Sequence, residues 1–285
     1  MGRTAVITGV GGQDGRYLAD LLVEKGWNVI GVNRRSSQPR DYLNDLKEKG
    51  VKLIEGDITD YSSVEKIVKQ YKPHHYYHLA AQSHVATSFQ EPLHTWDATG
   101  KAVLNILEVI RNVRPETRLY NAASSEMFGS MYSKKYRIEG YYEGVEHFNG
   151  NKTQENKDWN YHYFEPFQDE NTPMRPQSPY GIAKLAGFNA TRLYRESYGL
   201  FTCSGILFNH ESELRSLTFV TRKITNYVSR VRLAKELGKN IEKLKLGNLE
   251  AKRDWSHASD MVRAMHMMLC KDEPDDFVVG SGETY

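Results

Sequence analysis

The sequence has few cysteines, no long apolar run and almost no net charge. Cys203 and Cys270 are the two cysteines among 285 residues, and their separation matches no metal-ligand spacing. We therefore expect two reduced thiols, a cytoplasmic protein and no metal site. No apolar run is long enough to span a bilayer, and residues 1–3 lead into a predicted strand rather than a signal peptide. A net charge of +2 favours neither a nucleic acid nor a membrane as partner.

Strand and helix patterns alternate through residues 1–207, while 39% hydrophobic content is enough for a sizeable core. Short apolar, β-branched runs predict strands at 4–8, 28–32, 51–54, 75–80, 118–122 and 201–207. Helical spacing predicts helices at 17–25, 60–70 and 178–198, and one with Val103, Leu104, Leu107 and Ile110 on a single face. This alternation predicts an α/β protein with a Rossmann-type, doubly wound parallel sheet.

Two regions differ from this domain at 1–207. Residues 131–165 are rich in Tyr, Lys, Glu, Asn and Gly and show no clear period. Such a segment is typical of a functional loop or a disordered excursion. Residues 208–285 contain predicted helices at 219–237 and 259–269 and a strand at 277–279. We interpret them as a small substrate-binding region with segments that return to the first domain.

A glycine-rich stretch, residues 8–15, separates the first predicted strand from the first helix. Its glycines at 9, 12 and 15 allow a tight turn and a close approach of the backbone to a pyrophosphate. The following helix N-terminus presents free N–H groups and a partial positive charge. This strand–turn–helix context predicts a dinucleotide site. The alternative is a turn that only packs the helix on the strand.

The end of the second predicted strand indicates which dinucleotide binds. An acidic residue is typical there when the ribose 2′-hydroxyl is held, but this chain has Asn33 followed by Arg34, Arg35, Ser36 and Ser37. Guanidinium groups and hydroxyls suit a 2′-phosphate, which favours NADP. The alternative is a solvated basic turn.

Tyr180 and Lys184 lie four residues apart and therefore on one face of the predicted helix. Ser178 is a natural N-cap and Pro179 a natural first helical residue. The helix end and Lys184 are expected to lower the pKa of Tyr180 from its usual value of ~10. The pair is thus a candidate for proton transfer, and an exposed pair without function is the alternative.

Ser124 and Glu126 follow the fifth predicted strand. Ligands of open α/β sheets bind beyond the carboxyl ends of the strands, so both side chains are expected to face the site. Removal of a carbon-bound proton during an elimination requires a base such as Glu126. The alternative is that Glu126 caps the following turn.

Together these motifs resemble the extended short-chain dehydrogenase/reductase superfamily, and they are most similar to its nucleotide-sugar dehydratases of the GDP-mannose branch. The resemblance covers the chain except 131–165. The segments that carry it are ITGVGGQDGRYLADLL, NRRSS, EGDITD, HLAAQSHVATSF, SSEMFG, SPYGIAKL, GILFNHES, FVTRKI, LGNLEAKRDWSHASDMV and DEPDDFVVGSGE.

The resemblance implies a lyase that removes water from GDP-mannose to give GDP-4-keto-6-deoxymannose, with NADP as a retained cofactor. Tyr180 would accept the proton of the sugar O4, and Glu126 would remove the C5 proton. Ser124 stands where the family has Thr and would assist the departure of the C6 hydroxyl. A nucleotide-sugar epimerase or reductase and an NADP-binding scaffold or sensor without turnover remain as alternatives.

The resemblance also implies the binding residues. For the cofactor they are Gly9, Gly11, Gly12, Gln13, Asp14, Arg34, Arg35, Ser36, Ser37, Asp57, Ile58, Leu79, Ala80, Ala81, Gln82, Ser83, Tyr180, Lys184, His210 and Arg215. For the nucleotide sugar they are Ser83, Ser124, Glu126, Asn209, Lys223, Asn248 and Arg253.

The chain departs from the family pattern in several places. Residues 212–215 lack a proline and one arginine, and His94 replaces a tyrosine. The loop after Ser37 is short, which favours a homodimer over a tetramer. The long segment at 131–165 would form a lid, an assembly surface or a plain surface bulge. The family continues beyond Tyr285 with more of the substrate lobe, so we expect this lobe to be truncated.

Overall fold

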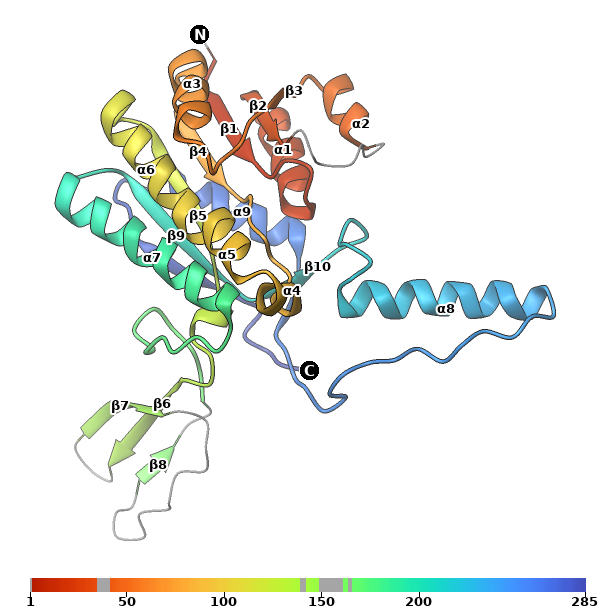
Figure 1. The fold of residues 1–285 in the computed structure, drawn as a ribbon. Helices are drawn as coiled ribbons and strands as arrows, with labels where there is room; N and C mark the ends of the chain where they lie inside the picture. Colours follow the sequence, from red (N-terminus) through yellow and green to blue (C-terminus); the bar gives the residue numbers. More distant parts are fainter. Residues whose placement is uncertain (1, 35–41, 139–141, 149–160, 164–165) are drawn as a thin grey trace.

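A seven-stranded parallel sheet forms the centre of the computed structural model, with helices on both faces (Figure 1). The structure describes the chain except residues 1, 35–41, 139–141, 149–160 and 164–165. The sheet strands are β1 (Thr4–Thr8), β2 (Asn28–Asn33), β3 (Lys52–Glu55), β4 (His75–His78), β5 (Arg118–Ser124), β9 (Thr202–Leu207) and β12 (Asp276–Val279). Their order, β12-β9-β5-β4-β1-β2-β3, is that of a Rossmann-type sheet, so the predicted fold class is confirmed.

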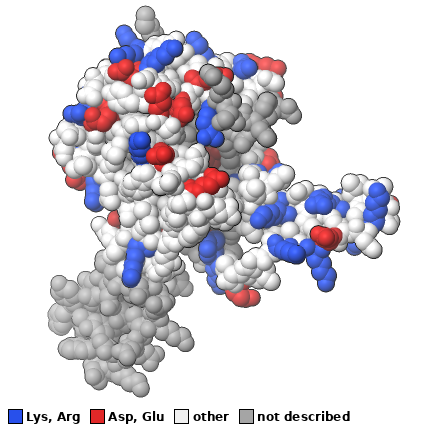
Figure 2. Space-filling model, viewed as in Figure 1, with Lys and Arg blue, Asp and Glu red and all other residues white. Residues whose placement is uncertain are grey.

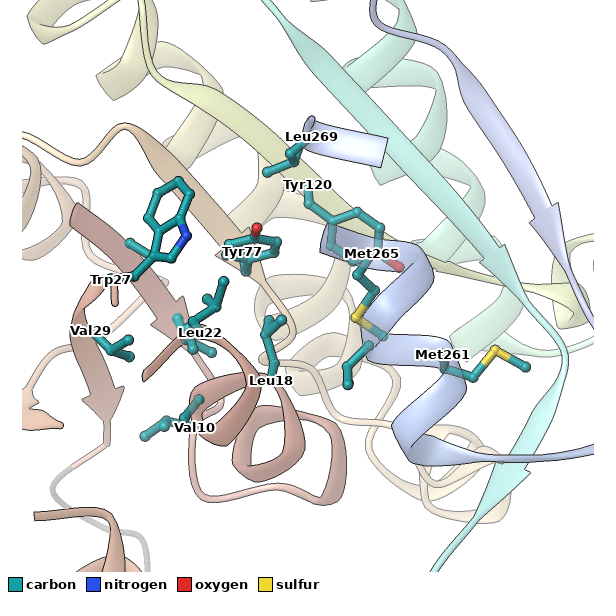
Figure 3. Packing of buried hydrophobic residues seen from close by; sticks show 14 of the residues in the cluster. Val10, Leu18, Leu22, Trp27, Val29, Tyr77, Tyr120, Met261, Met265 and Leu269 are labelled. Atoms are coloured by element: carbon teal, nitrogen blue, oxygen red, sulfur yellow. The ribbon is translucent and has the colours of Figure 1, made fainter. Parts of the chain in front are cut away.

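Helices α1 (Gln13–Glu24) and α9 (Ala258–Leu269) cover one face of the sheet. Figure 3 shows Leu18 and Leu22 of α1 and Met265 of α9 directed toward Tyr77 and Tyr120 of the sheet. All five side chains are fully buried. Burial of an aliphatic side chain of this size contributes about 1.5–3 kcal/mol, so this layer is a main source of stability.

Helices α3 (Tyr61–Tyr71), α6 (Ala102–Val113) and α7 (Pro179–Tyr198) cover the other face. Val103, Leu107 and Ile110 of α6 are buried as predicted, but Leu104 is 43% exposed. The prediction for Leu104 was wrong because it lies one position past Val103, about 100° around the helix.

Local sequence signals set the ends of these helices. Asp60 accepts a hydrogen bond from the Ser62 amide and caps α3, and Ser178 accepts one from the Gly181 amide and caps α7. Gly199, with φ of +64°, ends α7 in the left-handed conformation. Helix α1 begins at Gln13, four residues earlier than predicted, because the glycine turn leads directly into it.

Short elements connect the larger ones, and the periodicity argument missed them all. They include α2 (Tyr42–Glu48), α4 (Val85–Gln90), α5 (Pro92–Thr95), a π-helical turn (Trp96–Lys101) and a 3₁₀ turn (Ser125–Met127). Each is too short for an amphipathic period to be recognised.

The region predicted as a loop or disordered excursion contains three antiparallel strands. They are β6 (Tyr132–Ile138), β7 (Tyr142–Phe148) and β8 (Tyr161–Tyr163), and β6 is the central one. Ser133, at the start of β6, is fully buried and pairs through its backbone with Phe167. The described part of this region therefore contains regular strands, which the expectation of a functional loop or a disordered excursion did not include.

Residues 208–285 divide between a projecting part and the main sheet. Strands β10 (Asn209–Glu211) and β11 (Trp255–His257) form a two-stranded parallel sheet, and α8 (Val220–Glu236) extends away from the body (Figure 1). None of the residues of α8, all of which are described, is buried. By contrast, α9 packs against α1, and β12 pairs with β9. No helix within the described part of the chain combines the length and apolarity that a membrane crossing requires.

A buried ion pair joins α7 to the edge strand β12. Arg195 donates two hydrogen bonds to Asp276, at 2.6 and 3.2 Å, and a third to the Thr202 carbonyl. The Asp276 carboxylate also accepts from the Ser204 amide. This network fixes the last strand of the sheet to its neighbour.

We expect Asp276→Asn to lower the free energy of unfolding by about 2 kcal/mol, because a partly buried guanidinium loses its counter-charge. Urea denaturation followed by circular dichroism measures this loss. Asp272→Asn, at an exposed position four residues earlier, is the matched control and should change stability little. Equal midpoints for both variants would contradict the role given to the pair.

Candidate active site

Two adjoining cavities open at the carboxyl ends of the sheet strands. The first has a volume of about 510 Å³ and the second about 400 Å³. They share a border, so a single elongated ligand or two ligands end to end can occupy them. The residues that line both are Gly9, Gly12, Gln13, Leu79, Ala81, Ser83, His84, Arg215, Thr218 and Phe219.

The glycine turn forms the floor between the two cavities. Gly9 has φ of +73°, and a Cβ there would lie 2.8 Å from the Ala80 amide nitrogen. A Cβ at Gly15 would lie 2.3 Å from the Gly9 carbonyl oxygen, so only glycine lets α1 start this close to β1. Within the described residues, no side chain caps the N-terminus of α1. Its first amides can therefore bind an anionic phosphate group, which fits a dinucleotide.

The first cavity continues to the ends of β2 and β3. Asn33, Arg34, Asp57 and Ile58 line it, and Arg34 is exposed. Hydrogen bonds from the side chain and backbone of Thr59 lower the pKa of Asp57, so this carboxylate is held in one orientation. The predicted cofactor residues Arg35, Ser36 and Ser37 lie outside the described residues.

The segment after β4 borders both cavities and is held by α5 and by the π-helical turn that follows it. The Gln82 side chain donates to Thr95 and accepts from the His84 amide, and the Gln82 amide donates to Thr99. Thr95 and Thr99 are almost fully buried. Both ends of the Gln82 side chain are thus used to shape this segment, whereas Ser83 is exposed to the cavities.

His84 is a lining residue that the sequence argument did not single out. It caps α4, and its Nδ1 accepts a hydrogen bond from the Thr87 amide. The neutral ring therefore carries its proton on Nε2 and can donate from there. Phe219 packs against the imidazole ring edge to face. His84 reaches both cavities because of the path of the segment between β4 and α4, which could not be predicted from the sequence.

The four predicted catalytic residues all line the second cavity. Tyr180 and Lys184 come from the first turns of α7, and Ser124 and Glu126 come from the end of β5 and the turn after it. Tyr180, Lys184 and Ser124 are each less than a tenth exposed. Gly181 allows this approach, because a Cβ there would lie 2.9 Å from the Glu126 carbonyl oxygen.

The electrostatics of Tyr180 differ from the prediction. Burial raises its pKa to about 12, Glu126 and Asp14 add to this increase, and Ser124 and Arg215 oppose it. Lys184, whose ammonium donates to the Ala122 carbonyl at 2.6 Å and lies 5.8 Å from the Tyr180 ring centre, is not among the groups that lower this pKa. Burial also lowers the pKa of Lys184 to about 8.

The Glu126 carboxylate is not used as a turn cap. The Glu126 amide instead donates to the Ser124 hydroxyl, which caps the short 3₁₀ turn. No group in the described part of the chain donates a hydrogen bond to the Glu126 side chain, which is half-buried and lines the cavity. The carboxylate is therefore available to a ligand.

Two further predicted residues meet at the second cavity. His210 Nε2 lies 3.0 Å from Asp14 Oδ2, and His210 Nδ1 donates to the Phe208 carbonyl. Burial alone would raise the pKa of Asp14, but His210 lowers it overall. In turn, Asp14 raises the pKa of His210 against the effect of burial. The two side chains are thus an ion pair, and Arg215 lies nearby, stacked on Phe219.

Three predicted substrate residues are not brought to this site. Among the described residues Lys223, Asn248 and Arg253 line neither cavity, and all three are exposed. Lys223 belongs to α8, where Figure 2 shows Lys and Arg side chains gathered on the projecting helix. Asn209 does line the second cavity. The part of the chain that the structure describes holds no cluster of His, Cys, Asp or Glu suited to a metal ion.

Comparisons with known proteins identify relatives that match nearly the whole chain. The chain is 42% identical over 293 residues to a GDP-mannose 4,6-dehydratase of Vibrio cholerae, covering 99% of this chain and 68% of that protein. It is 39% identical to GDP-mannose 4,6 dehydratase 1 of Arabidopsis thaliana, covering 99% and 71%.

Solved structures share the fold at low identity. A UDP-glucose 4-epimerase of Thermotoga maritima with UDP-glucose superposes with a TM-score of 0.75 at 22% identity, over 99% of this chain and 78% of that one. A dTDP-glucose 4,6-dehydratase of Streptomyces venezuelae, solved with NAD, gives 0.76 at 18% identity, over 99% and 77%. A model of the NAD dependent epimerase/dehydratase family matches residues 5–280. The chain belongs to the NAD-dependent epimerase/dehydratase family.

Proposed function

We propose that the protein is a hydro-lyase that converts GDP-mannose to GDP-4-keto-6-deoxymannose. The observation that carries the proposal is the position of Glu126, whose carboxylate lines the same cavity as Tyr180, Lys184 and Ser124. An alcohol oxidation needs only the tyrosine, whereas an elimination also needs a group that removes a carbon-bound proton. The curated relatives at about 40% identity, named as GDP-mannose 4,6-dehydratases, support the choice of substrate.

Each residue has a distinct task in this reaction. The Tyr180 oxygen accepts the proton of the sugar O4, and Ser124 and Arg215 favour its charged form against burial. Lys184 lies on the same face of α7 as Tyr180, and its ammonium donates a hydrogen bond to the Ala122 carbonyl of β5. Glu126 removes the C5 proton, which the C4 ketone acidifies, and returns a proton to the C6 oxygen, which leaves as water. Ser124 donates a hydrogen bond during this step.

The nicotinamide, when bound, supplies the hydride acceptor and donor, so that C4 is oxidised, C6 is reduced and no net redox change results. The first cavity supports binding of the rest of the cofactor. The amides at the N-terminus of α1 would hold the pyrophosphate, and Asp57 and Ile58 border the far end of the cavity.

NADP is the proposed form of the cofactor. Arg34, at the end of β2, lines the first cavity, and within its described lining no acidic residue follows β2 directly. A guanidinium group fits a 2′-phosphate, while a ribose hydroxyl is usually held by a carboxylate at this place.

We expect Arg34→Ala to raise the dissociation constant of NADP by about tenfold or more and to leave that of NAD nearly unchanged. The physical reason is that only NADP carries the phosphate that the guanidinium binds. Fluorescence titration with both cofactors measures the two constants. A similar loss for NAD and NADP would show that Arg34 does not select the phosphate.

Incubation of the protein with NADP and GDP-mannose, followed by mass spectrometry, tests the function directly. Loss of one water from the sugar nucleotide supports dehydration, and an isomer of unchanged mass indicates an epimerase. Gain of two hydrogens by GDP-4-keto-6-deoxymannose, in a parallel incubation with NADPH, indicates a reductase. Tight NADP binding without turnover of any GDP- or dTDP-hexose would indicate a scaffold or sensor.

A homodimer is the proposed assembly. Helix α7 packs against α5, α6 and the π-helical turn between them, and these elements expose large apolar side chains at Leu93, Trp96, Leu104, Ile182 and Leu193. Such a patch on neighbouring helices suits a second copy of the same surface. Analytical ultracentrifugation tests whether the protein is a dimer rather than a tetramer.

A further inference from the structure

The first turn of α1 borders both cavities, and its backbone and its side chains make different contacts there. Its backbone amides face the glycine turn, and Gln13 lines both cavities. The Gln13 side chain is only 7% exposed and is hydrogen-bonded to His210 and Ser212, in the segment 209–215. A single turn of helix thus connects a ligand-binding backbone to a distant segment of the chain.

Both ends of the Gln13 amide hold this segment. Gln13 Nε2 donates to the His210 carbonyl at 3.2 Å and to Asp14 Oδ1 at 3.1 Å. Gln13 Oε1 accepts from the Ser212 hydroxyl at 2.8 Å, and the same hydroxyl accepts from the Leu214 amide. The side chain of Gln13 is therefore fully engaged within the protein, and its part in cofactor binding falls to the backbone.

Two neighbouring contacts strengthen the connection. Asp14, the next residue of α1, forms its ion pair with His210 at 3.0 Å. One turn later the Tyr17 hydroxyl donates to Glu213 at 2.8 Å. The Asp14–His210 contact is charged and partly buried, so it resists separation more than the exposed contact between Tyr17 and Glu213.

Apart from α1, the segment is held by a short sheet, by packing of α9 against β10 and by a hydrogen bond from the Thr221 hydroxyl to Glu211. Its strand β10 consists of three residues that pair only with the three residues of β11, and so small a sheet is not stable alone. The same segment brings Asn209 and Arg215 to the second cavity, and Arg215 is aligned by its ion pair with Glu211 and by Phe219. The position of these groups therefore depends on the first turn of α1.

We infer that Gln13 and Ser212 couple the two cavities, so that a dinucleotide on the amides of α1 raises the affinity of the 209–215 segment for the nucleotide sugar. The inference rests on the proposed function, because it assigns the second cavity to that substrate. A ligand that restrains the first turn of α1 also restrains the segment bonded to it. By linkage, the nucleotide sugar must increase the affinity for the dinucleotide by the same factor.

Isothermal titration of GDP, used as the probe, with and without saturating NADP measures the coupling. In the unmodified protein we expect NADP to lower the dissociation constant of GDP by about fivefold or more. In Gln13→Leu and Ser212→Ala the ratio should fall toward one. Ser212→Thr keeps the hydroxyl that donates to Gln13, so its ratio of GDP dissociation constants without and with NADP should equal that of the unmodified protein. If any substitution at residue 212 disturbed the site, Ser212→Thr would lower the ratio as well.

Amide hydrogen exchange with NADP alone provides a second measurement. NADP should slow exchange in peptides that cover 209–215 in the unmodified protein and not in Ser212→Ala. The inference is overturned if the dissociation constant of GDP is the same with and without NADP. It is also overturned if NADP changes this constant equally in Ser212→Ala and in the unmodified protein. If GDP does not bind at all, the proposed function fails, and the exchange measurement still decides whether α1 and the segment are coupled.

Discussion

Tyr180→Phe is expected to reduce the rate of GDP-mannose dehydration by between about 100- and 10,000-fold. The substitution removes the oxygen that accepts the O4 proton and keeps the ring that fills the cavity wall, where Tyr180 is 8% exposed. Because C4 must be oxidised before C5 becomes acidic, no later step can compensate. Single-turnover measurements of product formation by mass spectrometry give the rate.

Binding measurements separate this chemical effect from damage to the fold. The dissociation constants of NADP and GDP should change by less than a few fold, because the Tyr180 oxygen is one contact among many in the two cavities. Tyr194→Phe is the matched control, since it removes a hydroxyl from the same helix at its far end, where the oxygen donates to Glu108. Full dehydration activity in Tyr180→Phe would remove Tyr180 from the mechanism.

Glu126→Gln is expected to stop dehydration while the first oxidation continues. The amide is nearly the same size as the carboxylate, but it cannot accept the C5 proton, so loss of water should slow by about 100-fold or more. Tyr180, Lys184 and Ser124 remain in place, so the C4 hydrogen should still be transferred. A rise in absorbance of the reduced nicotinamide on mixing with GDP-mannose, without loss of water, is the expected result.

Comparison with Glu170→Gln shows whether the effect belongs to this cavity. Glu170 is exposed and accepts a hydrogen bond from the Val278 amide, outside the second cavity. Its variant should dehydrate GDP-mannose at the unmodified rate. Loss of water at the unmodified rate in Glu126→Gln would show that Glu126 is not the base of the elimination.

Some features of the site follow from local sequence alone. The glycine turn at residues 9–15 needs the conformations that glycine allows, and the caps at Asp60 and Ser178 act within their own first turns. Tyr180 and Lys184 share a helix face because they are four residues apart. The alternation of strands and helices likewise predicted the parallel sheet, since neighbouring residues set each element.

Helix α1 shows where a local prediction stops short. Its apolar spacing begins at Tyr17, and the helix itself starts at Gln13, because the first turn has glycine and polar residues that contact a distant segment. The strands β6 and β7 were missed for a similar reason. Their pairing joins residues across a hairpin, while the sequence between 131 and 165 has no regular alternation of apolar and polar residues.

The sequence by itself determined the fold class and which residue types were present for proton transfer. Only the tertiary structure decided that Ser124 and Glu126 lie in one cavity with Tyr180, that Gln13 holds residues 210–212, and that Lys223 and Arg253 are exposed away from it. It also decided that burial has the largest effect on the pKa of Tyr180 and raises it. Burial and long-range contacts depend on what packs around a residue after folding, and neighbours along the chain do not contain that information.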